Sequence, residues 1–247
     1  MPTTVIIPAR YESSRFPGKP LTPLRGATGE YKTLIRRTWE VAVQFTSAEN
    51  VYVASDDDRV ISHARQFGQA IKTVVPCENG TERCAVAANI LALNADDLVI
   101  NLQGDSPLMP WKWLDRLARF MLSNPETEVA TVAAAMPDEP KPGAVSVVPG
   151  LTADALYFSR SRIPSAGPWF MHFGIYAYRV STLRRYLDWG PSPYERAEAL
   201  EQIRFLERGV PMHCYLSYGM ETAPLAEVNY PNDVLLVERE LERCNIK

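Results

Sequence analysis

The first candidate for chemistry is a loop rich in basic residues near the start of the sequence. Residues 7–21 read IPARYESSRFPGKPL and carry three cations, Arg10, Arg15 and Lys19. The serine hydroxyls at positions 13 and 14, and Gly18, which lets backbone approach closely, are features that a phosphate cradle uses. The Walker pattern GxxxxGK followed by Ser or Thr is absent. Two interpretations stay open: a solvated basic surface loop, or a site for a phosphorylated ligand.

Asp105 is a candidate metal ligand. It follows residues 98–102, which read as a buried strand, and comes directly after Gly104. A carboxylate held at the edge of a sheet suits Mg²⁺, which takes few protein ligands and shares phosphate oxygens. The alternative is an aspartate that caps the helix expected after Pro107.

Three further segments carry polar residues that could bind a ligand. Gly80 and Thr81 could offer an N–H group and a hydroxyl to a base or a sugar, although Thr81 could equally be a simple helix cap. His172 stands alone before an apolar strand, which is more typical of a structural histidine. Glu201 and Gln202 fall within an expected helix and would ordinarily lie on its solvated face.

The elements that must position these residues alternate between strand and helix in the first half of the chain. We expect strands at 5–7, 51–54, 72–75 and 98–102, and helices at 31–45, 56–67 with Ser55 as its cap, 80–93 and 110–122. Four strand-then-helix units predict an α/β fold with a mostly parallel sheet covered on both faces. Because ligands bind at the carboxyl ends of such strands, the segments after Pro8, Ser55, Val75 and Leu102 should share one crevice.

The second half of the chain is less regular. Strands are expected at 129–135, 144–148, 154–158, 173–178 and 212–217, and helices at 181–187, 194–208 and 231–243. Residues 137–143 (PDEPKPG) predict a loop that is too short to be a domain linker. We therefore expect one domain over residues 1–247, with a small lobe at roughly 137–217.

Composition excludes some classes of protein. The 247 residues carry a formal net charge of −3, which does not favour a nucleic-acid partner. The four cysteines, at 77, 84, 214 and 244, form no CxxC pair and are not flanked by histidines at zinc-ligand spacing, so we expect reduced thiols. Neither a secretory signal nor a run long enough to span a membrane is visible, so a soluble cytoplasmic protein is expected.

Taken together, seven segments resemble the 3-deoxy-manno-octulosonate cytidylyltransferases, the CMP-Kdo synthetases. They occur in order along nearly the whole chain: IPARYESSRFPGKPL, ASDDDRV, NGTERCA, VINLQGDSPL, ALYFSRSRIP, HFGIYAYR and PSPYERAEALEQIRFLERG. The resemblance implies a Rossmann-like nucleotidyltransferase fold, Mg²⁺ dependence and a homodimer. It also implies a reaction that joins CTP to the anomeric hydroxyl of a 2-keto-3-deoxy sugar acid and releases pyrophosphate.

The resemblance also implies roles for individual residues. Arg10, Ser13 and Lys19 should hold the triphosphate, and Arg10, Lys19 and Asp105 should be catalytic, with Asp105 as a Mg²⁺ ligand. The remaining nucleotide-binding residues should be Pro8, Ala9, Ser55, Gly80, Thr81, Arg83 and Gln103. The sugar-acid pocket should be lined by Gln103, Arg160, His172, Tyr176, Glu201 and Gln202.

The sequence departs from the family pattern in three places. The family ends with a segment close to GVDTPEDL, whose first aspartate is the second Mg²⁺ ligand, and this chain has Asn229 there. Glu227 or Asp233 could supply the missing charge. The loop at 165–171 is shorter than usual, and GATGEYKTLI replaces a GKPMI-like turn at 26–35. Three alternatives therefore stay open: another 2-keto-3-deoxy acid as substrate, a sialate-like or other sugar nucleotidyltransferase, and a catalytically silent nucleotide-binding protein.

Overall fold

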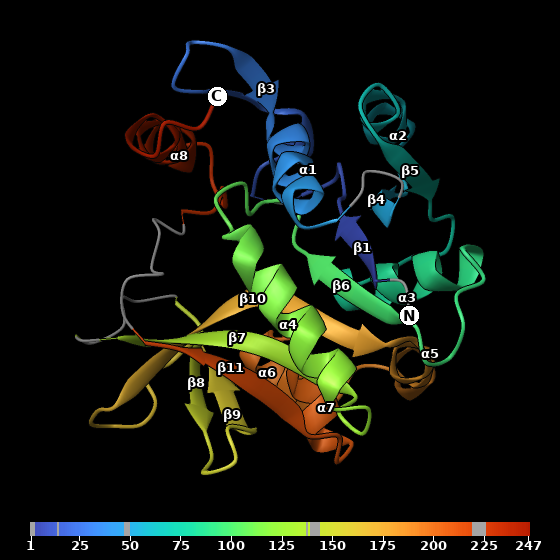
Figure 1. Ribbon diagram of the computed structural model, residues 1–247, viewed down its shortest axis with the longest axis vertical. Helices are drawn as coiled ribbons and strands as arrows, with labels where there is room; N and C mark the ends of the chain where they lie inside the picture. Colours follow the sequence, from blue (N-terminus) through green and yellow to red (C-terminus); the bar gives the residue numbers. More distant parts are fainter. Residues whose placement is uncertain (1–2, 14, 47–49, 137, 139–143, 219–225) are drawn as a thin grey trace.

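The fold is built on a nine-stranded sheet with helices on both faces (Figure 1). The computed structural model describes residues 3–13, 15–46, 50–136, 138, 144–218 and 226–247. Of the loop expected at 137–143, all but residue 138 therefore lies outside the described residues. Along its main path the strand order is β11-β7-β10-β6-β1-β4-β5. The α/β class and the mostly parallel sheet expected from the sequence are confirmed.

The first half of the chain forms the parallel part of the sheet. Its strands are β1 (Thr3–Pro8), β4 (Val51–Ser55), β5 (Gln69–Lys72) and β6 (Leu98–Leu102). Its helices are α1 (Leu34–Phe45), α2 (Asp58–Ala64), α3 (Gly80–Ile90) and α4 (Trp111–Ser123). β1 lies between β4 and β6 and pairs with both in parallel register. All five residues of β6 are buried, as expected of a central parallel strand.

The second half adds mainly antiparallel strands. They are β7 (Val129–Met136), β8 (Ser146–Pro149), β9 (Ala155–Ser159), β10 (Trp169–Arg179) and β11 (Met212–Ser217). The helices are α5 (Val180–Trp189), α6 (Pro193–Glu198), α7 (Ile203–Glu207) and α8 (Asp233–Arg243). β10 lies between β6 and β7 and is antiparallel to both, so it joins the two halves. It begins at Trp169, which leaves the loop before it shorter than the sequence indicated.

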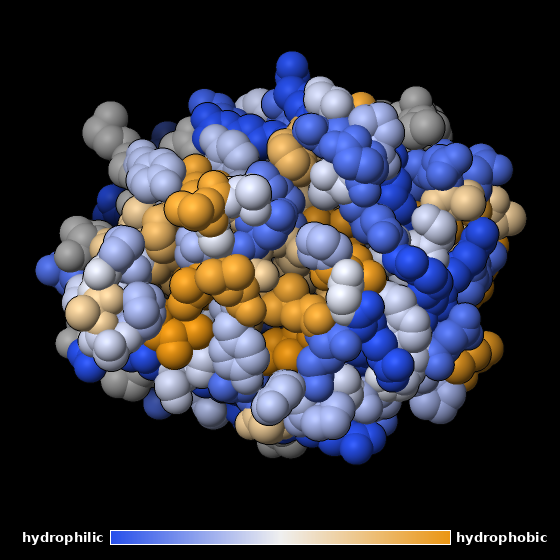
Figure 2. Space-filling view, turned by 90° about the horizontal axis from the view of Figure 1, so that it is seen from below, coloured by the Kyte–Doolittle hydropathy of each residue, from blue (hydrophilic) through white to orange (hydrophobic). Residues whose placement is uncertain are grey.

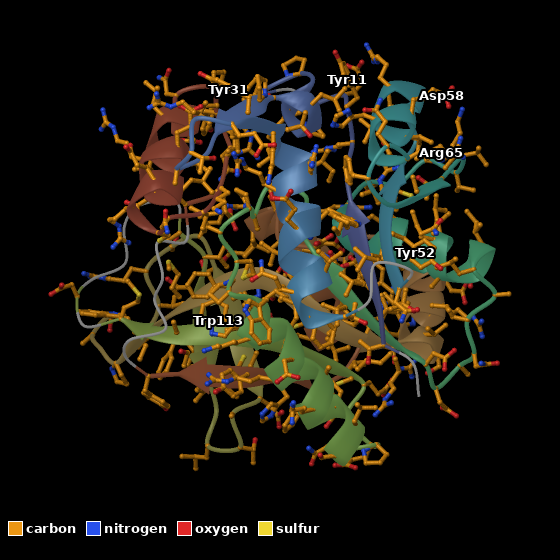
Figure 3. All side chains as sticks on the ribbon, turned by 45° about the horizontal axis from the view of Figure 1, so that its top comes forward. Tyr11, Tyr31, Tyr52, Asp58, Arg65 and Trp113 are labelled. Carbon is orange, nitrogen blue, oxygen red and sulfur yellow. The ribbon has the colours of Figure 1, made fainter. Side chains whose placement is uncertain are left out.

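Two hydrophobic clusters cover the two faces of the sheet. Strand side chains alternate between faces, so Ile100 packs into one cluster and Val99 into the other. Trp113 of α4 is fully buried against Phe173 of β10, with ring centroids 4.9 Å apart, and it points from α4 toward the sheet (Figure 3). All four cysteines are unpaired, as predicted. No helix of the described ranges has the length and apolar character that a bilayer crossing requires.

Several element boundaries differ from the sequence prediction. The strand expected at 72–75 is β5, at residues 69–72, because the ladder with β4 ends where the Thr73 N–H donates to the Ser55 carbonyl. Val74 and Val75 lie beyond that ladder and are exposed. The helix expected from 31 begins at Leu34, because β3 (Tyr31–Thr33) pairs with β2 (Pro23–Arg25) in a small hairpin.

Two helix caps are also not the residues expected. Ser55 is the last residue of β4, and the side chain of Asp57 accepts the N–H of Arg59 at the start of α2. Asn79, not Thr81, caps α3 by accepting the N–H of Glu82. The single helix expected at 194–208 is divided into α6 and α7, and Ala199 between them has a φ of 53°. Residues 200–202 therefore form a turn between two short helices and are not part of a solvated helix face.

Candidate active site

The loops that follow β1, β4 and β6 meet at one edge of the sheet. Pro8 is in register with Ala54, and Ile6 with Asn101, so these strands end side by side. The loop after β6 lies directly against the end of β1, since a Cβ on Gly104 would come within 2.8 Å of the Pro8 carbonyl oxygen. Only glycine permits this close approach of the two loops. The segments after β1, β4 and β6 therefore lie at one edge of the sheet, as expected.

The basic loop after β1 reaches the acidic end of β6. Lys19 Nζ lies 2.6 Å from Asp105 Oδ2, and this ion pair is only partly exposed. Gly18 has a φ of 75° and donates its N–H to the Tyr11 carbonyl, which folds the loop back on itself. Arg59 of α2 lies over the Tyr11 ring, 3.3 Å from its centroid, at the end of the molecule where Figure 3 shows Tyr11. These contacts hold the loop between α2 and β6.

The other predicted triphosphate residues lie along the same loop. Pro8 and Ala9 are buried at the end of β1, whereas Arg10 is exposed and has no ion-pair partner among the described residues. The hydroxyl of Ser13 accepts the N–H of Phe16 in a local turn. Arg10 is therefore an exposed cation directly after β1 that is available to an anionic ligand.

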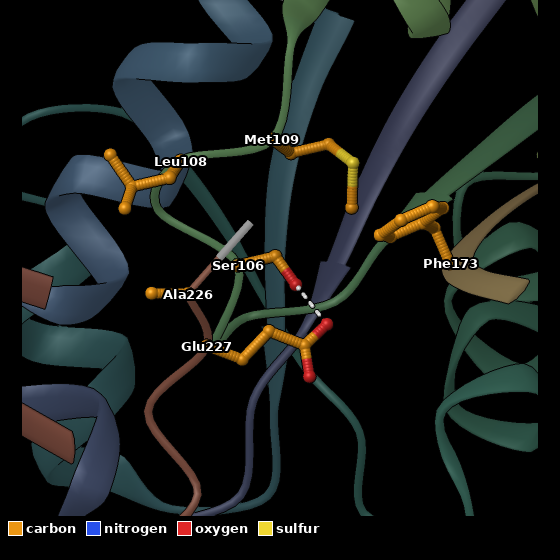
Figure 4. Close-up of a pocket in the computed structure, with 6 residues that line it drawn as sticks. All are labelled: Ser106, Leu108, Met109, Phe173, Ala226 and Glu227. Carbon is orange, nitrogen blue, oxygen red and sulfur yellow. Dashed lines mark hydrogen bonds between the residues drawn. The ribbon is translucent and has the colours of Figure 1, made fainter. Parts of the chain in front are cut away.

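A second carboxyl group faces Asp105. The Val228 N–H donates to the Asp105 carbonyl, which places residues 227–229 beside the β6 loop. Ser106 Oγ donates to Glu227 Oε1 at 3.3 Å (Figure 4), and the side chain of Asn229 also hydrogen bonds to Glu227. Burial, and next the negative charge of Asp105, raise the pKa of Glu227.

These side chains fit a hard divalent cation. Two carboxyl groups that repel each other, with the side chain of Asn229 hydrogen bonded to one of them, supply oxygen ligands of the kind that Mg²⁺ prefers. Asp233 does not belong to this set, because its carboxylate accepts the N–H groups of Asn229 and Tyr230 at the start of α8. The described residues include no cluster of three or more His, Cys, Asp or Glu side chains that could hold a metal ion.

A small pocket opens beside the two carboxyl groups. Its cavity volume is about 10 Å³, and it combines one polar wall with an apolar one (Figure 4). The polar wall is Ser106 and Glu227, and the apolar wall is formed by Leu108, Met109, Phe173 and Ala226. Glu227 therefore borders a small cavity, with room for about one water molecule, whose other walls are mostly apolar.

The remaining nucleotide candidates lie around the start of α3. Ser55 is fully buried, and its hydroxyl accepts the N–H of Asp57. Arg83 is also buried, and its guanidinium binds Thr73 Oγ1 at 2.5 Å and Asp56 Oδ2 at 3.1 Å. The Thr81 hydroxyl shares a 2.9 Å hydrogen bond with Tyr178. A Cβ on Gly80 would come within 2.7 Å of Gln103 Nε2, which places α3 against the loop after β6.

Four of the six predicted sugar-pocket residues meet in one polar cluster. Gln103 Nε2 lies 3.3 Å from Glu201 Oε1, and the Tyr176 hydroxyl donates to Gln202 Oε1 at 3.4 Å. Glu201 Oε2 accepts the N–H of Thr81 at the start of α3. Burial raises the pKa of Glu201 to about 7, although the N–H groups of Thr81 and Gly80 oppose this shift.

The other two lie at the margin of this cluster. His172 is buried with its ring 5.4 Å from that of Tyr176, and its Nε2 is 2.9 Å from Thr131 Oγ1. Burial lowers the pKa of His172 to about 3, so the ring is neutral. Arg160 is exposed after β9, and its Nη2 donates to the Ala199 carbonyl beside the turn that carries Glu201.

Two residues of this region were missed by sequence reasoning. Asn101 lies in a strand that reads as apolar, although a single amide in such a strand was a visible signal. Arg204 is fully buried and joins the carboxylates of Glu82 and Glu195. No pattern in the sequence distinguished it from an exposed helical arginine.

The chain is similar in sequence to known proteins. The chain matches the sequence profile of the family described as "Cytidylyltransferase" over residues 4–214. A 3-deoxy-manno-octulosonate cytidylyltransferase of Hahella chejuensis is 40% identical over 228 residues, which cover 85% of this chain and 87% of that protein. The enzyme of the same name from Vibrio campbellii is 39% identical over 250 residues, 95% of each chain.

The fold is also similar to solved structures. The structure of CMP:2-keto-3-deoxy-manno-octonic acid synthetase complexed with CTP superposes with a TM-score of 0.85 at 35% identity, over 98% of each chain. A cytidylyltransferase of Leptospira borgpetersenii shares the fold, with a TM-score of 0.64 at 18% identity, over 96% of this chain and 84% of that one. On the extent of the family match and of the identity to these relatives, the chain belongs to the cytidylyltransferase family.

Proposed function

We propose that this protein is a 3-deoxy-manno-octulosonate cytidylyltransferase. It would join CTP to the anomeric hydroxyl of Kdo and release pyrophosphate. The observation that carries the proposal is the 2.6 Å contact between Lys19 Nζ and Asp105 Oδ2. This contact places the end of a basic loop against an acidic strand end, where a triphosphate and its metal ion would have to meet. The names of the relatives and the CTP in a similar solved structure support the same reaction.

The residues of the basic loop would act on the phosphates. Nucleotidyl transfer depends mainly on positioning and on neutralisation of charge. Lys19 and the exposed Arg10 would bind the triphosphate and stabilise the pyrophosphate as it leaves. Arg83, held by Thr73 and Asp56, and the closely packed Gly80 would border the nucleotide.

Asp105, Glu227 and Asn229 would hold Mg²⁺. When bound, Mg²⁺ supplies positive charge at the α-phosphate and lowers the pKa of the sugar hydroxyl. With Mg²⁺ bound, Glu227 would provide the charge that Asn229 lacks, because it lies close enough to Asp105 for the two carboxyl groups to repel. The presence of this second carboxyl group argues against a catalytically silent protein.

The sugar acid would bind next to the nucleotide, in the cluster of Gln103, Tyr176, Glu201 and Gln202. Arg160 at its rim would bind the sugar carboxylate, which a guanidinium can hold through two parallel hydrogen bonds. His172 is neutral and would position Tyr176 beside it.

We also propose an oligomeric state and a cellular location. Exposed apolar side chains on the β8–β9 side, which include Leu151, Leu156 and Tyr194, would form a homodimer contact within the small lobe at 137–217. Figure 2 shows apolar side chains gathered across the face of the molecule seen from below. The enzyme would work in the cytoplasm, and its product would feed lipopolysaccharide or a capsule.

Release of pyrophosphate tests the proposal directly. The protein is incubated with CTP, Mg²⁺ and a panel of acids: Kdo, modified octulosonates and a nonulosonate, with a reaction that lacks the acid as control. We expect turnover with Kdo. Turnover with the nonulosonate alone would instead indicate a sialate-like enzyme. Binding of CTP without turnover of any acid would leave only a nucleotide-binding protein.

A further inference from the structure

Two buried amide groups in the polar cluster have donors without a partner. Within the described part of the chain, Asn101 Nδ2 and Gln202 Nε2 make no hydrogen bond. Asn101 is fully buried and Gln202 is 2% exposed. A buried N–H group that is left unsatisfied costs about 1–3 kcal/mol, so each such group requires an explanation.

The two donors belong to one ring of side chains. Asn101 of β6 is in register with Tyr176 of β10, so both project from the same face of the sheet. The Tyr176 hydroxyl donates to Gln202 Oε1, and Glu201, next in sequence to Gln202, accepts from Gln103. Gln103 Nε2 also lies 3.5 Å from Asn101 Oδ1, which closes the ring.

Gln103 makes long, weak hydrogen bonds that a ligand could displace. Its Nε2 is 3.5 Å from Asn101 and 3.3 Å from Glu201, both longer than the 2.9–3.0 Å typical of N–H···O bonds. An incoming ligand can exchange these weak bonds for its own. Movement of Gln103 would then give the ligand access to the two unpartnered donors.

The two unpartnered donors and their neighbours favour a ligand group that is a neutral oxygen acceptor. Both free groups are N–H donors, so the ligand must offer an oxygen lone pair. A sugar carbon that carries no hydroxyl group cannot offer one. The buried Glu201 and the phenols of Tyr176 and Tyr178 lie near one another, and the buried cation Arg204 is already held by Glu82 and Glu195. A carboxylate buried here without a free cation would lose its hydration uncompensated, whereas a hydroxyl group would fit.

We propose that Asn101 is a specificity-determining residue, and that its Nδ2 and the Nε2 of Gln202 together bind one hydroxyl oxygen of the sugar acid. This inference rests on the proposed function for the identity of the sugar. The carboxylate of the sugar acid would then lie toward the exposed Arg160, and the bound hydroxyl would lie between Asn101 and Gln202.

The Asn101→Val variant tests this proposal. Valine suits a wholly buried central strand, and the change removes an unpartnered donor, so we expect no loss of thermal stability. The KM for Kdo should rise about 10- to 100-fold, while the KM for CTP stays within about twofold. Asn101→Ala gives a second variant if valine disturbs folding. Ser146→Ala is the matched control, since it removes a buried hydroxyl without a partner on β8.

Kdo analogues that each lack one hydroxyl identify the group that binds. The analogue that lacks the bound hydroxyl should have the same KM with wild type and with Asn101→Val, because it cannot make the hydrogen bond that the variant removes. An unchanged KM for Kdo in both Asn101 variants would overturn the proposal and indicate an ordered water between the two amides. If the wild type turns over no acid, the proposed function is wrong. The inference is then decided by calorimetric titration of Kdo with CTP present: weaker binding to the variants supports it, and equal or absent binding overturns it.

Discussion

At the scale of single residues, the acidic site depends on the relation between three side chains. Asn229 stands where the family pattern has an aspartate, which removes one negative charge. Glu227, two positions earlier, is held by Ser106 and by Asn229 itself and faces Asp105. A second carboxyl group therefore lies beside Asp105, two positions before Asn229. A site with two facing carboxyl groups should still bind Mg²⁺, although the geometry is not that of the usual pair.

Restoring the aspartate should strengthen metal binding. If Asn229 is a ligand position, Asn229→Asp adds a third negative charge, and we expect the Mg²⁺ concentration for half-maximal rate to fall by about tenfold. The measurement is the rate of pyrophosphate release against Mg²⁺ concentration. Asn232→Asp is the matched control, because Asn232 is exposed three positions away. Equal Mg²⁺ dependence in both variants would count against the assignment of Asn229.

Glu201 should make stability depend on pH. Burial raises its pKa from 4.5 to about 7, so the folded protein keeps a proton that the unfolded chain has lost between these pH values. Stability therefore falls as the pH rises through this window. Relative to Glu201→Gln, the free energy of unfolding of the wild type should fall by at most about 3 kcal/mol between pH 4.5 and 7.

Urea unfolding at a series of pH values measures this difference. Glu126→Gln, at an exposed position, gives the background pH dependence of a glutamate removed from the surface. A difference between wild type and Glu201→Gln that stays constant with pH would show that Glu201 ionises normally in the folded protein.

At the scale of elements, the turn between α6 and α7 shows what local sequence could not predict. The apolar spacing over 194–208 is that of one continuous helix, and periodicity carries no information about distant partners. In the fold, Arg204 binds both oxygens of Glu195 at 2.7 Å and also reaches Glu82 of α3 at 3.0 Å. Tyr186 of α5 donates its hydroxyl to the Glu201 carbonyl. These contacts from three other segments hold the turn in which Glu201 and Gln202 face the sheet.

The loss of Arg204 should weaken both the fold and the pocket. Arg204→Met leaves the buried carboxylate of Glu195 and the partly buried carboxylate of Glu82 without their cation, and we expect a loss of about 3–5 kcal/mol in the free energy of unfolding. The KM for the sugar acid should rise as the turn loosens. Arg208→Met, which removes an exposed side chain from the same helix end, should cost less than about 1 kcal/mol. Equal losses of unfolding free energy in the two variants, measured by urea unfolding, would show that the ion pairs of Arg204 do not stabilise the fold.

At the scale of the whole molecule, the sequence predicted the parallel half of the sheet and the edge at which its strand ends meet. Buried β-branched runs that alternate with helices leave few other arrangements, so Pro8, Ser55 and Asp105 could be placed together in advance. The position of β10 between β6 and β7 could not be predicted, because strand order in space does not follow order in the chain. That position brings Tyr176 beside Asn101 and so builds the polar cluster.

The apolar side chains of the β8–β9 ribbon lead to a prediction about assembly. Leu156 of β9 is 66% exposed, and the fully exposed Leu151 lies in the adjoining turn, so burial of this surface would favour a second copy of the chain. We expect the wild type to sediment as a dimer and Leu156→Asp as a folded monomer, because the change places a charge in the contact. Leu235→Asp, at a leucine of α8 that is 62% exposed, should remain a dimer. A monomeric wild type, or equal behaviour of the two variants, would show that this ribbon is not the contact surface.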